Sequence, residues 1–424
     1  MIENFNVVVG IPSYNESRTI GHVTSMVGHG LNKYFPDCKS IIVNCDNCSP
    51  DGTRDVFLST EIPPGIHRKY ITTPDGVRGK GNNFYNLFTF CREAEAKVTI
   101  VVDADLQSIT PEWIQYLGYP IRDGHDYVTP LYSRHQFDGT ITNHFCYPLV
   151  YSLMGFDIRQ PIGGDFAFSP RLCSYWLDQE WNEMNRQYGI DIFMSLNACS
   201  GVFRVCQAGL GAKIHNASFP KLGKMFEEVV YTLFSTLLKY RSHWRDTRLH
   251  QWCERDEQEE IRTVHLYGME AMTDFAMPFS IDFLKLKEQC REEYEKHHDL
   301  LKHYLSPYAY RHLHDNFSMD RYDIDIMLWS QIVYRLLYIF DGAPEQVKRD
   351  VINVLKPLYF ARSIAFDYQT YRYSINSAEN EIRQQAMAFL SQKPYLIGLY
   401  LGQGTAFPAT SPFGNYTYHS KLPG

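Results

Sequence analysis

Residues 98–105 read VTIVVDAD, and this stretch decides how the first half of the chain folds. Its first five residues are apolar or β-branched, which is typical of a strand buried on both faces of a parallel sheet. Two carboxylates, Asp103 and Asp105, follow the strand directly. Ligands of open parallel sheets bind beyond the carboxyl ends of the strands. We therefore expect the chemistry of this protein to lie just after this strand.

The rest of the first half repeats this alternation of strand and helix. Apolar runs at 7–11 and 40–44 and a shorter one at 70–72 predict strands. Amphipathic patterns at about 19–31 and 82–96, and a start signal near Thr53, predict helices. Strands that alternate with helices indicate an α/β fold with a parallel sheet.

The second half has a different pattern, and we expect it to be mainly helical. Its amphipathic stretches predict helices at 283–305, 327–340, 347–355 and 380–390, with prolines between them. We therefore divide the chain into residues 1–240, an α/β domain, and residues 241–424, a mainly α-helical region.

Composition and charge exclude two classes of partner. The 424 residues include 41 Lys and Arg against 48 Asp and Glu, a formal net charge of −7. This balance argues against a general nucleic-acid binder, which carries a basic face. The most apolar later stretch, 324–340, is interrupted by charged and polar residues and is shorter than the roughly 20 residues of a membrane span. With no signal sequence at its start, we expect a soluble, cytoplasmic protein.

Three loops after the predicted strands carry residues suited to a nucleotide and its phosphates. Asp103 and Asp105 could share a divalent cation with a diphosphate, although a D-x-D pair also occurs in ordinary solvated turns. The turn at 46–52 could bind a base or ribose, or its polar side chains could serve only the turn itself. Residues 79–82, GKGN, place glycines and Lys80 before a helix, where an anion would be favoured.

Taken together, these motifs resemble a known family. Residues 11–16 (IPSYNE), the turn that ends at 51–53 (DGT) and residues 103–105 (DAD) have the order and spacing of the GT-A nucleotide-sugar glycosyltransferases. Four later segments resemble mannosylglycerate synthase and glucosyl-3-phosphoglycerate synthase: 160–165 (QPIGGD), 188–191 (YGID), 209–215 (GLGAKIH) and 221–225 (KLGKM). The resemblance covers about residues 6–230, and the later helices match more loosely.

The resemblance implies a role for each matching position. Donor binding is implied for eight residues: Pro12, Tyr14, Glu16, Asp46, Lys80, Asp103, Gly163 and Gly164. Asp105 and His215 would ligate the cation, Mg²⁺ or Mn²⁺, and Asp103 would lie beside the ribose or the metal. A neutral imidazole suits a borderline ion such as Mn²⁺, and the cation would stabilise the departing diphosphate.

The resemblance also implies that the anomeric configuration of the sugar is retained, with Asp165 and Asp191 as the candidate catalytic acids. We favour a front-face displacement, in which the leaving phosphate oxygen helps to remove the acceptor proton. Asp191 would then position the sugar or the acceptor. The alternative is that both acids only cap the loops around their neighbouring glycines.

The acceptor segment departs from the family pattern. Synthases that act on 3-phosphoglycerate carry G-R-x-T here, whereas this chain has GTIT at 139–142, which keeps Thr142 but lacks the Arg. The family's Asn two residues after the metal histidine is Ala217 here. These losses favour an acceptor with only a carboxylate, such as D-glycerate, which Arg134, Arg159 or Lys221 could bind together with Thr142.

These inferences predict a metal-dependent retaining glycosyltransferase that moves a hexose, with glucose favoured, from a UDP-, GDP- or ADP-sugar to D-glycerate or 3-phosphoglycerate. An inverting family-2 transferase that acts on a saccharide or lipid-linked acceptor is the alternative within this class. Other classes are a nucleotidyltransferase, whose Gly-rich opening loop is missing, and a non-catalytic sugar-binding protein. The sequence leaves the donor base and the oligomeric state open, a homodimer through the helical region included.

Overall fold

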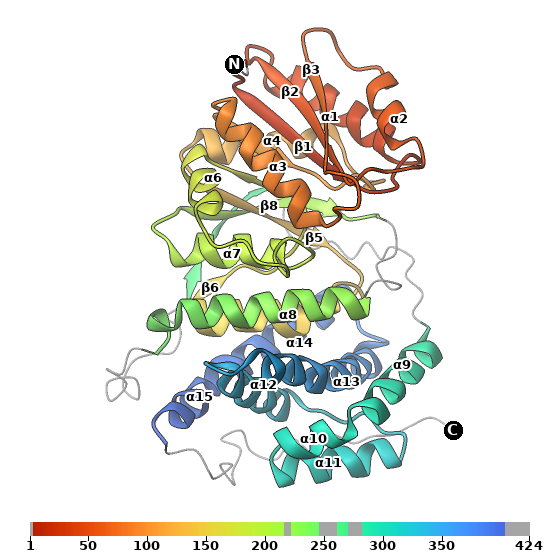
Figure 1. The fold of residues 1–424 in the computed structure, drawn as a ribbon, viewed down its shortest axis with the longest axis vertical. Helices are drawn as coiled ribbons and strands as arrows, with labels where there is room; N and C mark the ends of the chain where they lie inside the picture. The colour runs from red at the N-terminus through yellow and green to blue at the C-terminus, as the bar shows by residue number, and fades with distance from the viewer. Residues whose placement is uncertain (1–2, 216–221, 246–260, 270–281, 403–424) are drawn as a thin grey trace.

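The computed structural model describes residues 3–215, 222–245, 261–269 and 282–402. A β-sheet with its covering helices forms one end of the molecule, and a stack of helices forms the other (Figure 1). Helix α8, Leu222–Lys239, lies between the two parts and packs on a helix of each, α7 on the sheet side and α13 in the stack.

The sheet has eight strands in the order β10-β8-β5-β7-β4-β1-β2-β3. Its strands are β1 Val7–Ser13, β2 Ser40–Asp46, β3 His67–Thr72, β4 Val98–Val101, β5 Tyr127–Ser133, β7 Phe166–Phe168, β8 Val205–Ala212 and β10 His265–Gly268. All described pairings in this sheet are parallel except those of β7, which is antiparallel to β4 and β5. The prediction of a parallel sheet is therefore wrong for β7, a strand of three residues that the sequence pattern did not predict.

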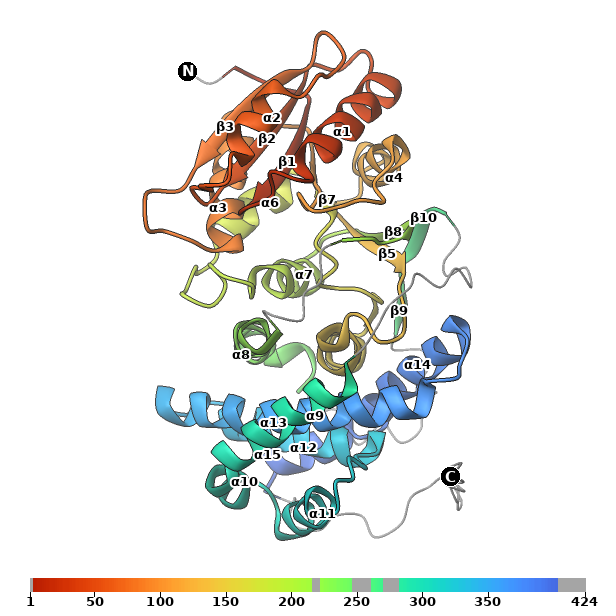
Figure 2. The same ribbon diagram turned by 90° about the vertical axis from the view of Figure 1, so that its right-hand side faces the viewer.

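Helices cover both faces of the sheet (Figure 2). One face carries α1, Ile20–Tyr34, and α4, Pro111–Arg122, and the other carries α3, Lys80–Glu93, α6, Pro170–Leu177, and α7, Ile190–Ser200. Alternate residues of β1 point to the two cores: Val7, Val9 and Ile11 join the core under α1 and α4, and Val8 joins the opposite one. The short helix α2, Thr53–Ser59, follows β2. The predicted double burial is confirmed for β1, β2 and β4, whereas the edge strand β3 is partly exposed.

The C-terminal half is mainly helical, as predicted, but several boundaries differ, and the helices at Pro307–Ser318 and Lys393–Tyr400 were not predicted. Its helices are α9 Phe283–Lys296, α10 His298–Tyr304, α11 Pro307–Ser318, α12 Ile326–Phe340, α13 Glu345–Thr370, α14 Ile375–Ser391 and α15 Lys393–Tyr400. The helix predicted over 283–305 is interrupted at His297, which ends α9 and precedes α10. Helix α13 continues through Pro357, where a break was expected, because both sides of that proline are buried in the core.

One hydrophobic core crosses the predicted division at residue 240. A segment with π-helical turns at both ends (η1 Thr142–Cys146, α5 Tyr147–Leu149, η2 Val150–Met154) leads from the sheet into the helical half. Its Phe145 packs in one cluster with Phe226 of α8, Trp329 of α12 and Tyr359 of α13. β6, Phe156–Asp157, then pairs with β9, Arg262–Thr263. The segment that begins at Thr142 is thus fixed by both halves of the chain.

Within the described residues, none of the helices combines the length and the apolar character that crossing a membrane requires.

Candidate active site

The loops after β1 and β2 are bonded into one wall at the carboxyl edge of the sheet. The backbone N–H of Asn15 donates to Ser49 Oγ at 2.8 Å, and that of Glu16 donates to Thr53 Oγ1 at 2.9 Å. Asn15 has a positive φ of 60°, a conformation that asparagine tolerates better than most residues. The predicted motif at 11–16 and the predicted turn at 46–52 are therefore held together as a single surface.

Asp46 supports this wall from inside. Its side chain is fully buried and accepts hydrogen bonds from the hydroxyls of Ser13 at 2.7 Å, Ser49 at 2.6 Å and Tyr70 at 2.8 Å. A carboxylate with these partners satisfies the chain itself. The geometry thus favours the turn-capping alternative for Asp46 over direct contact with a nucleotide.

Other donor candidates on this wall differ in exposure. Pro12 is buried within β1, whereas Tyr14 and Glu16 are partly exposed. The guanidinium of exposed Arg78 lies over the Tyr14 ring, 4.8 Å from its centroid. Sequence reasoning missed Arg78, although it stands only two residues before Lys80. The Tyr14–Arg78 pair is the exposed part of this wall that could meet a base or a phosphate.

The glycines at the start of α3 serve a different purpose from the one predicted. A Cβ on Gly79 would lie 2.3 Å from Arg186 O, and a Cβ on Gly81 would lie 2.1 Å from Asn185 O. The N–H of Gly81 donates to Gln187 O at 3.2 Å. The glycines thus admit residues 185–187, whose carbonyls take the N–H groups of Gly81 and Asn82, so these two N–H groups are not free for an anion.

Lys213, which sequence reasoning missed, is the centre of the site. Its ammonium is 2% exposed and donates to Asp165 Oδ2 at 2.8 Å, Gly163 O at 2.8 Å and Asp103 Oδ2 at 3.0 Å. The residue is the one charged side chain in the run 205–215, which begins as a buried strand. That isolated charge was the available signal, because a lysine is buried only when it is paired.

Asp165 is an internal anchor. It is 0% exposed and accepts from Lys213, from the backbone N–H of Asp103 at 2.8 Å and from the Tyr132 hydroxyl. Burial and the neighbouring Asp165 raise the pKa of the Tyr132 phenol, so this partner stays a donor. Both oxygens of this buried carboxylate are taken by donors of the chain itself, which argues against the catalytic role predicted for Asp165.

Gly163 and Gly164, which were predicted to bind the donor, allow Pro130 and the Asp103 carboxylate to approach the backbone closely. A Cβ on Gly163 would lie 2.1 Å from Pro130 Cγ, and a Cβ on Gly164 would lie 2.3 Å from Asp103 Oδ2. Gly164 also has a positive φ of 89°. Only a residue without a side chain fits at these two positions.

Lys80 connects the two remaining acids of the site. Its ammonium lies 3.3 Å from Asp103 Oδ1 and 3.2 Å from Asp191 Oδ2. Burial alone would raise the pKa of Asp103, but Lys80 and Lys213 hold it well below its usual range. Burial raises the pKa of Asp191 in spite of Lys80, and its Oδ1 is buried with no hydrogen-bond partner. The structure thus brings the three predicted residues Lys80, Asp103 and Asp191 together, and Asp191 Oδ1 has no hydrogen-bond partner.

The candidate metal ligands stand on two segments that touch. The backbone N–H of Gln107 donates to Ile214 O at 2.9 Å, and that of Ile214 donates to Ser108 Oγ at 2.9 Å. Asp105 stands two residues before Gln107, and His215 directly follows Ile214. No group of three or more His, Cys, Asp or Glu suited to a metal exists among the described residues. A cation that is also bound by substrate phosphates needs only one or two protein ligands, so this pair fits Mg²⁺ or Mn²⁺. Asp103, with both oxygens on lysines, fits a ligand role less well.

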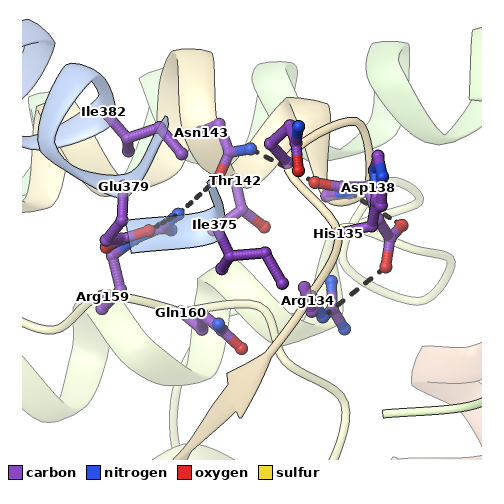
Figure 3. A pocket seen from close by; sticks show the side chains of 12 residues that line it. Arg134, His135, Asp138, Thr142, Asn143, Arg159, Gln160, Ile375, Glu379 and Ile382 are labelled. Atoms are coloured by element: carbon purple, nitrogen blue, oxygen red, sulfur yellow. Dashed lines mark hydrogen bonds and ion pairs between the residues drawn. The ribbon is translucent and has the colours of Figure 1, made fainter. Parts of the chain in front are cut away.

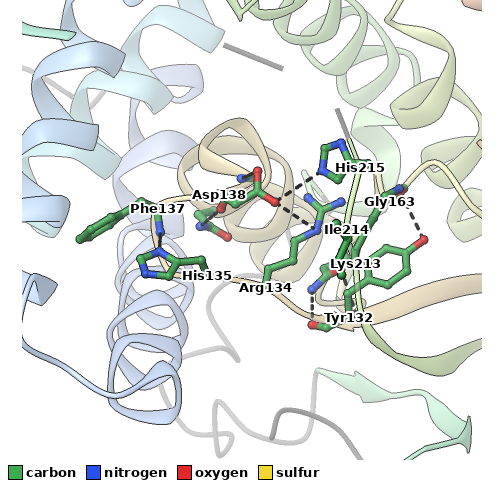
Figure 4. Close-up of polar contacts among 12 residues, drawn as sticks. Tyr132, Arg134, His135, Phe137, Asp138, Gly163, Lys213, Ile214 and His215 are labelled. Carbon is green, nitrogen blue, oxygen red and sulfur yellow. Dashed lines mark hydrogen bonds and ion pairs between the residues drawn. The ribbon is translucent and has the colours of Figure 1, made fainter. Parts of the chain in front are cut away.

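A small pocket lies beside this network, at the predicted acceptor segment. Arg134, Asp138, Thr142 and Arg159 are among the residues that line it (Figure 3). Asp138 faces both Arg134, with Nε at 3.8 Å, and His215, with Nε2 at 3.7 Å (Figure 4). The structure therefore brings Arg134, Thr142 and Arg159 together next to the metal candidate His215. Lys221, predicted to bind the acceptor, lies outside the described residues.

Residues 8–174 match the family model described as Glycosyl transferase family 2. The chain carries a glycosyltransferase domain. The matched segment runs from β1 to α6 and includes Lys80, Asp103 and Asp165. The predictions of a glycosyltransferase and of its α/β fold are confirmed by this match.

Solved structures of similar fold include glucosyl-3-phosphoglycerate synthase from Mycobacterium tuberculosis. Its complex with phosphoglyceric acid is 20% identical and matches 55% of this chain and 80% of that chain, with a TM-score of 0.44. Its complex with Mg²⁺ and uridine diphosphate is 21% identical over 55% and 79%, with a TM-score of 0.45. A crystal structure described as a mycobacterial protein is 23% identical over 55% and 75%, with a TM-score of 0.45. No curated protein matches the chain.

Proposed function

We propose that this protein is a metal-dependent, retaining glycosyltransferase. It moves a hexose, with glucose favoured, from a nucleotide diphosphate sugar to D-glycerate or a closely related acid such as 3-phosphoglycerate. One observation carries the proposal: two lysines, the partly exposed Lys80 and the buried Lys213, bracket Asp103 at the carboxyl edge of a glycosyltransferase sheet, next to a pocket lined by arginines.

The donor diphosphate suits the positive side of this network. Lys80 keeps its proton because Asp103 and Asp191 raise its pKa against the effect of burial. Its side chain is 16% exposed, whereas that of Lys213 is 2% exposed. Lys80 is therefore the ammonium that a diphosphate can reach, and Lys213 holds Asp103 in place behind it. The exposed Tyr14–Arg78 pair is where the nucleoside end of the donor would lie.

Asp105 and His215 would hold the divalent cation. Bound there, it would supply Lewis-acid stabilisation of the negative charge on the leaving diphosphate. Asp138 lies next to this imidazole, with its Oδ2 3.7 Å from His215 Nε2. Burial would raise the pKa of Asp138, but Arg134 and His215 hold it below its usual range, so the acid remains a carboxylate.

Asp191 is the acid best placed to touch the sugar. Its Oδ2 accepts from Lys80 at 3.2 Å, and its unpartnered Oδ1 can accept a hydroxyl of the hexose or of the acceptor. This arrangement orients the sugar and agrees with a front-face displacement. The acceptor hydroxyl then loses its proton toward the departing phosphate oxygen, and no side chain needs to act as nucleophile.

A matrix of donors and acceptors tests the proposal. UDP-, GDP- and ADP-hexoses are each incubated with D-glycerate or 3-phosphoglycerate and with MgCl₂ or MnCl₂, and nucleoside diphosphate release is measured. We expect turnover for at least one pair and none after addition of a chelator. Absence of sugar transfer in every combination refutes the proposed substrates. Release of pyrophosphate from a nucleoside triphosphate and a sugar phosphate would indicate a nucleotidyltransferase instead.

The family 2 match keeps one alternative open, an inverting transferase with a saccharide or lipid-linked acceptor. The configuration of the product distinguishes the two reactions. A proton NMR spectrum of the product of an α-linked donor shows an α-linkage if the configuration is retained. A β-linkage would establish the inverting alternative.

A further inference from the structure

The pocket beside the acceptor segment has a wall that belongs to the far end of the chain. Ile375, Glu379 and Ile382 of α14 line it opposite the residues of the acceptor segment (Figure 3). Helix α14 lies beyond the matched glycosyltransferase domain, which ends at residue 174. The helical region therefore contributes side chains to a pocket that the first domain begins.

Arg159, one of the residues that line this pocket, is held in a fixed position. The residue is 5% exposed, and its guanidinium donates to Glu379 through Nε at 2.5 Å and Nη2 at 2.9 Å. Nη2 also donates to Asn143 Oδ1 at 2.8 Å, and the guanidinium carbon lies 5.2 Å from the centroid of the Tyr147 ring. The third nitrogen, Nη1, is buried and has no hydrogen-bond partner. This nitrogen is a donor that an acceptor atom of a ligand in the pocket can use.

Arg134, which also lines the pocket, supplies a second buried nitrogen without a hydrogen-bond partner. Arg134 Nε is buried without a hydrogen-bond partner, although Asp138 Oδ2 lies 3.8 Å away. The charged side chains among the lining residues are thus two guanidinium groups and two carboxylates, Asp138 and Glu379. Unused donors attract an anion, while the balanced charge limits how much negative charge the pocket accepts.

We propose that Glu379 is a specificity-determining residue that matches this pocket to the single charge of a carboxylate and disfavours a phosphate. This inference rests on the proposed function and names the acceptor class of the same site. A carboxylate can accept a hydrogen bond from a guanidinium nitrogen such as Arg159 Nη1, and it brings one negative charge. A phosphate monoester brings about two charges at neutral pH, and its repulsion by Glu379 is correspondingly larger.

The Glu379→Gln substitution isolates this charge effect. Glutamine keeps the shape of the side chain and an oxygen that can accept from Arg159, while Asn143 and the Tyr147 ring still hold the guanidinium. Because a dianion gains twice the interaction of a monoanion, we expect affinity to rise about 3-fold for D-glycerate and about 10-fold for inorganic phosphate. The measurement is isothermal titration of the full-length protein at about pH 8, where phosphate is mainly dianionic.

Matched variants separate this effect from a general change of charge. Glu381→Gln makes the same charge change on α14, but Glu381 bonds Gln369 and does not line the pocket. We expect this control to leave both affinities unchanged. If Glu379→Gln does not fold, Asn143→Asp tests the opposite sign, since a third carboxylate in the pocket should weaken phosphate binding more than glycerate binding.

The ratio of the two affinities decides the inference. The inference is overturned if the ratio of phosphate affinity to glycerate affinity in Glu379→Gln stays within about 2-fold of the ratio in the unmodified protein. It is also overturned if the Glu381→Gln control changes this ratio equally. Failure of the unmodified protein to bind either anion would also overturn it. The proposed function is tested separately by sugar transfer in the donor and acceptor matrix, so failure of one does not imply failure of the other.

Discussion

Replacement of Lys213 by Met should destabilise the folded protein strongly. The substitution removes a 2% exposed ammonium but keeps a long apolar side chain in its place. Asp165, which is 0% exposed, then keeps its negative charge without the 2.8 Å partner that compensates it. Removal of one partner from a buried ion pair costs about 3–5 kcal/mol in free energy of unfolding. We expect the loss to fall in this range, and turnover to fall with it because Asp103 loses one of its two lysines.

The double variant Lys213→Met/Asp165→Asn should recover most of that loss, because it removes the buried charge that the single variant leaves uncompensated. The assay is urea unfolding followed by tryptophan fluorescence. The control is the surface variant Lys239→Met, which loses a 2.7 Å bond to Gln179 and an exposed contact with the Tyr240 ring. A change below about 1 kcal/mol for Lys213→Met, similar to an exposed pair, would refute the reasoning. So would a double variant no more stable than the single one.

Three further predictions concern the metal, the acceptor and a buried acid. Asp105→Ala and His215→Ala should each lower kcat about 100-fold or more while the circular dichroism spectrum stays unchanged; near-normal turnover in either variant would remove that residue from the metal site. Thr142→Val should raise the acceptor KM about 3- to 10-fold, the value of one hydrogen bond, and an unchanged acceptor KM in steady-state kinetics would exclude contact. Burial raises the pKa of Asp367 to about 8, with Arg362 opposing, so the folded state holds this proton more tightly than the unfolded state and stability falls as pH rises from about 4 to about 8. Asp367→Asn should therefore raise the thermal midpoint more at about pH 8.5 than at about pH 5, and equal gains at both would contradict this.

Much of the fold could be predicted from local sequence patterns. The strands near 7–11, 40–44 and 98–102 were identified because double burial produces continuous apolar runs, and the carboxyl ends of such strands indicated where Asp103 and Asp105 lie. Strand β7, Phe166–Phe168, was missed because three residues are too few to show a pattern. Helix α13 extends past Pro357 because packing around that proline outweighs its local preference.

In the candidate site, too, the positions of the loops could be predicted from neighbouring residues, whereas the contacts between distant residues could not. The sequence alone determined which loops carry polar groups, since each loop follows directly from its own strand. Only the tertiary structure decided what those groups do: Lys213 joins Asp165 across 48 positions of chain, and Glu379 reaches Arg159 across 220. Partners so far apart leave no spacing in the sequence, because their distance is set by the packing of whole helices and strands. The physical reason is that a buried charge needs a neutralising neighbour in space, and a chain can supply that neighbour from any position.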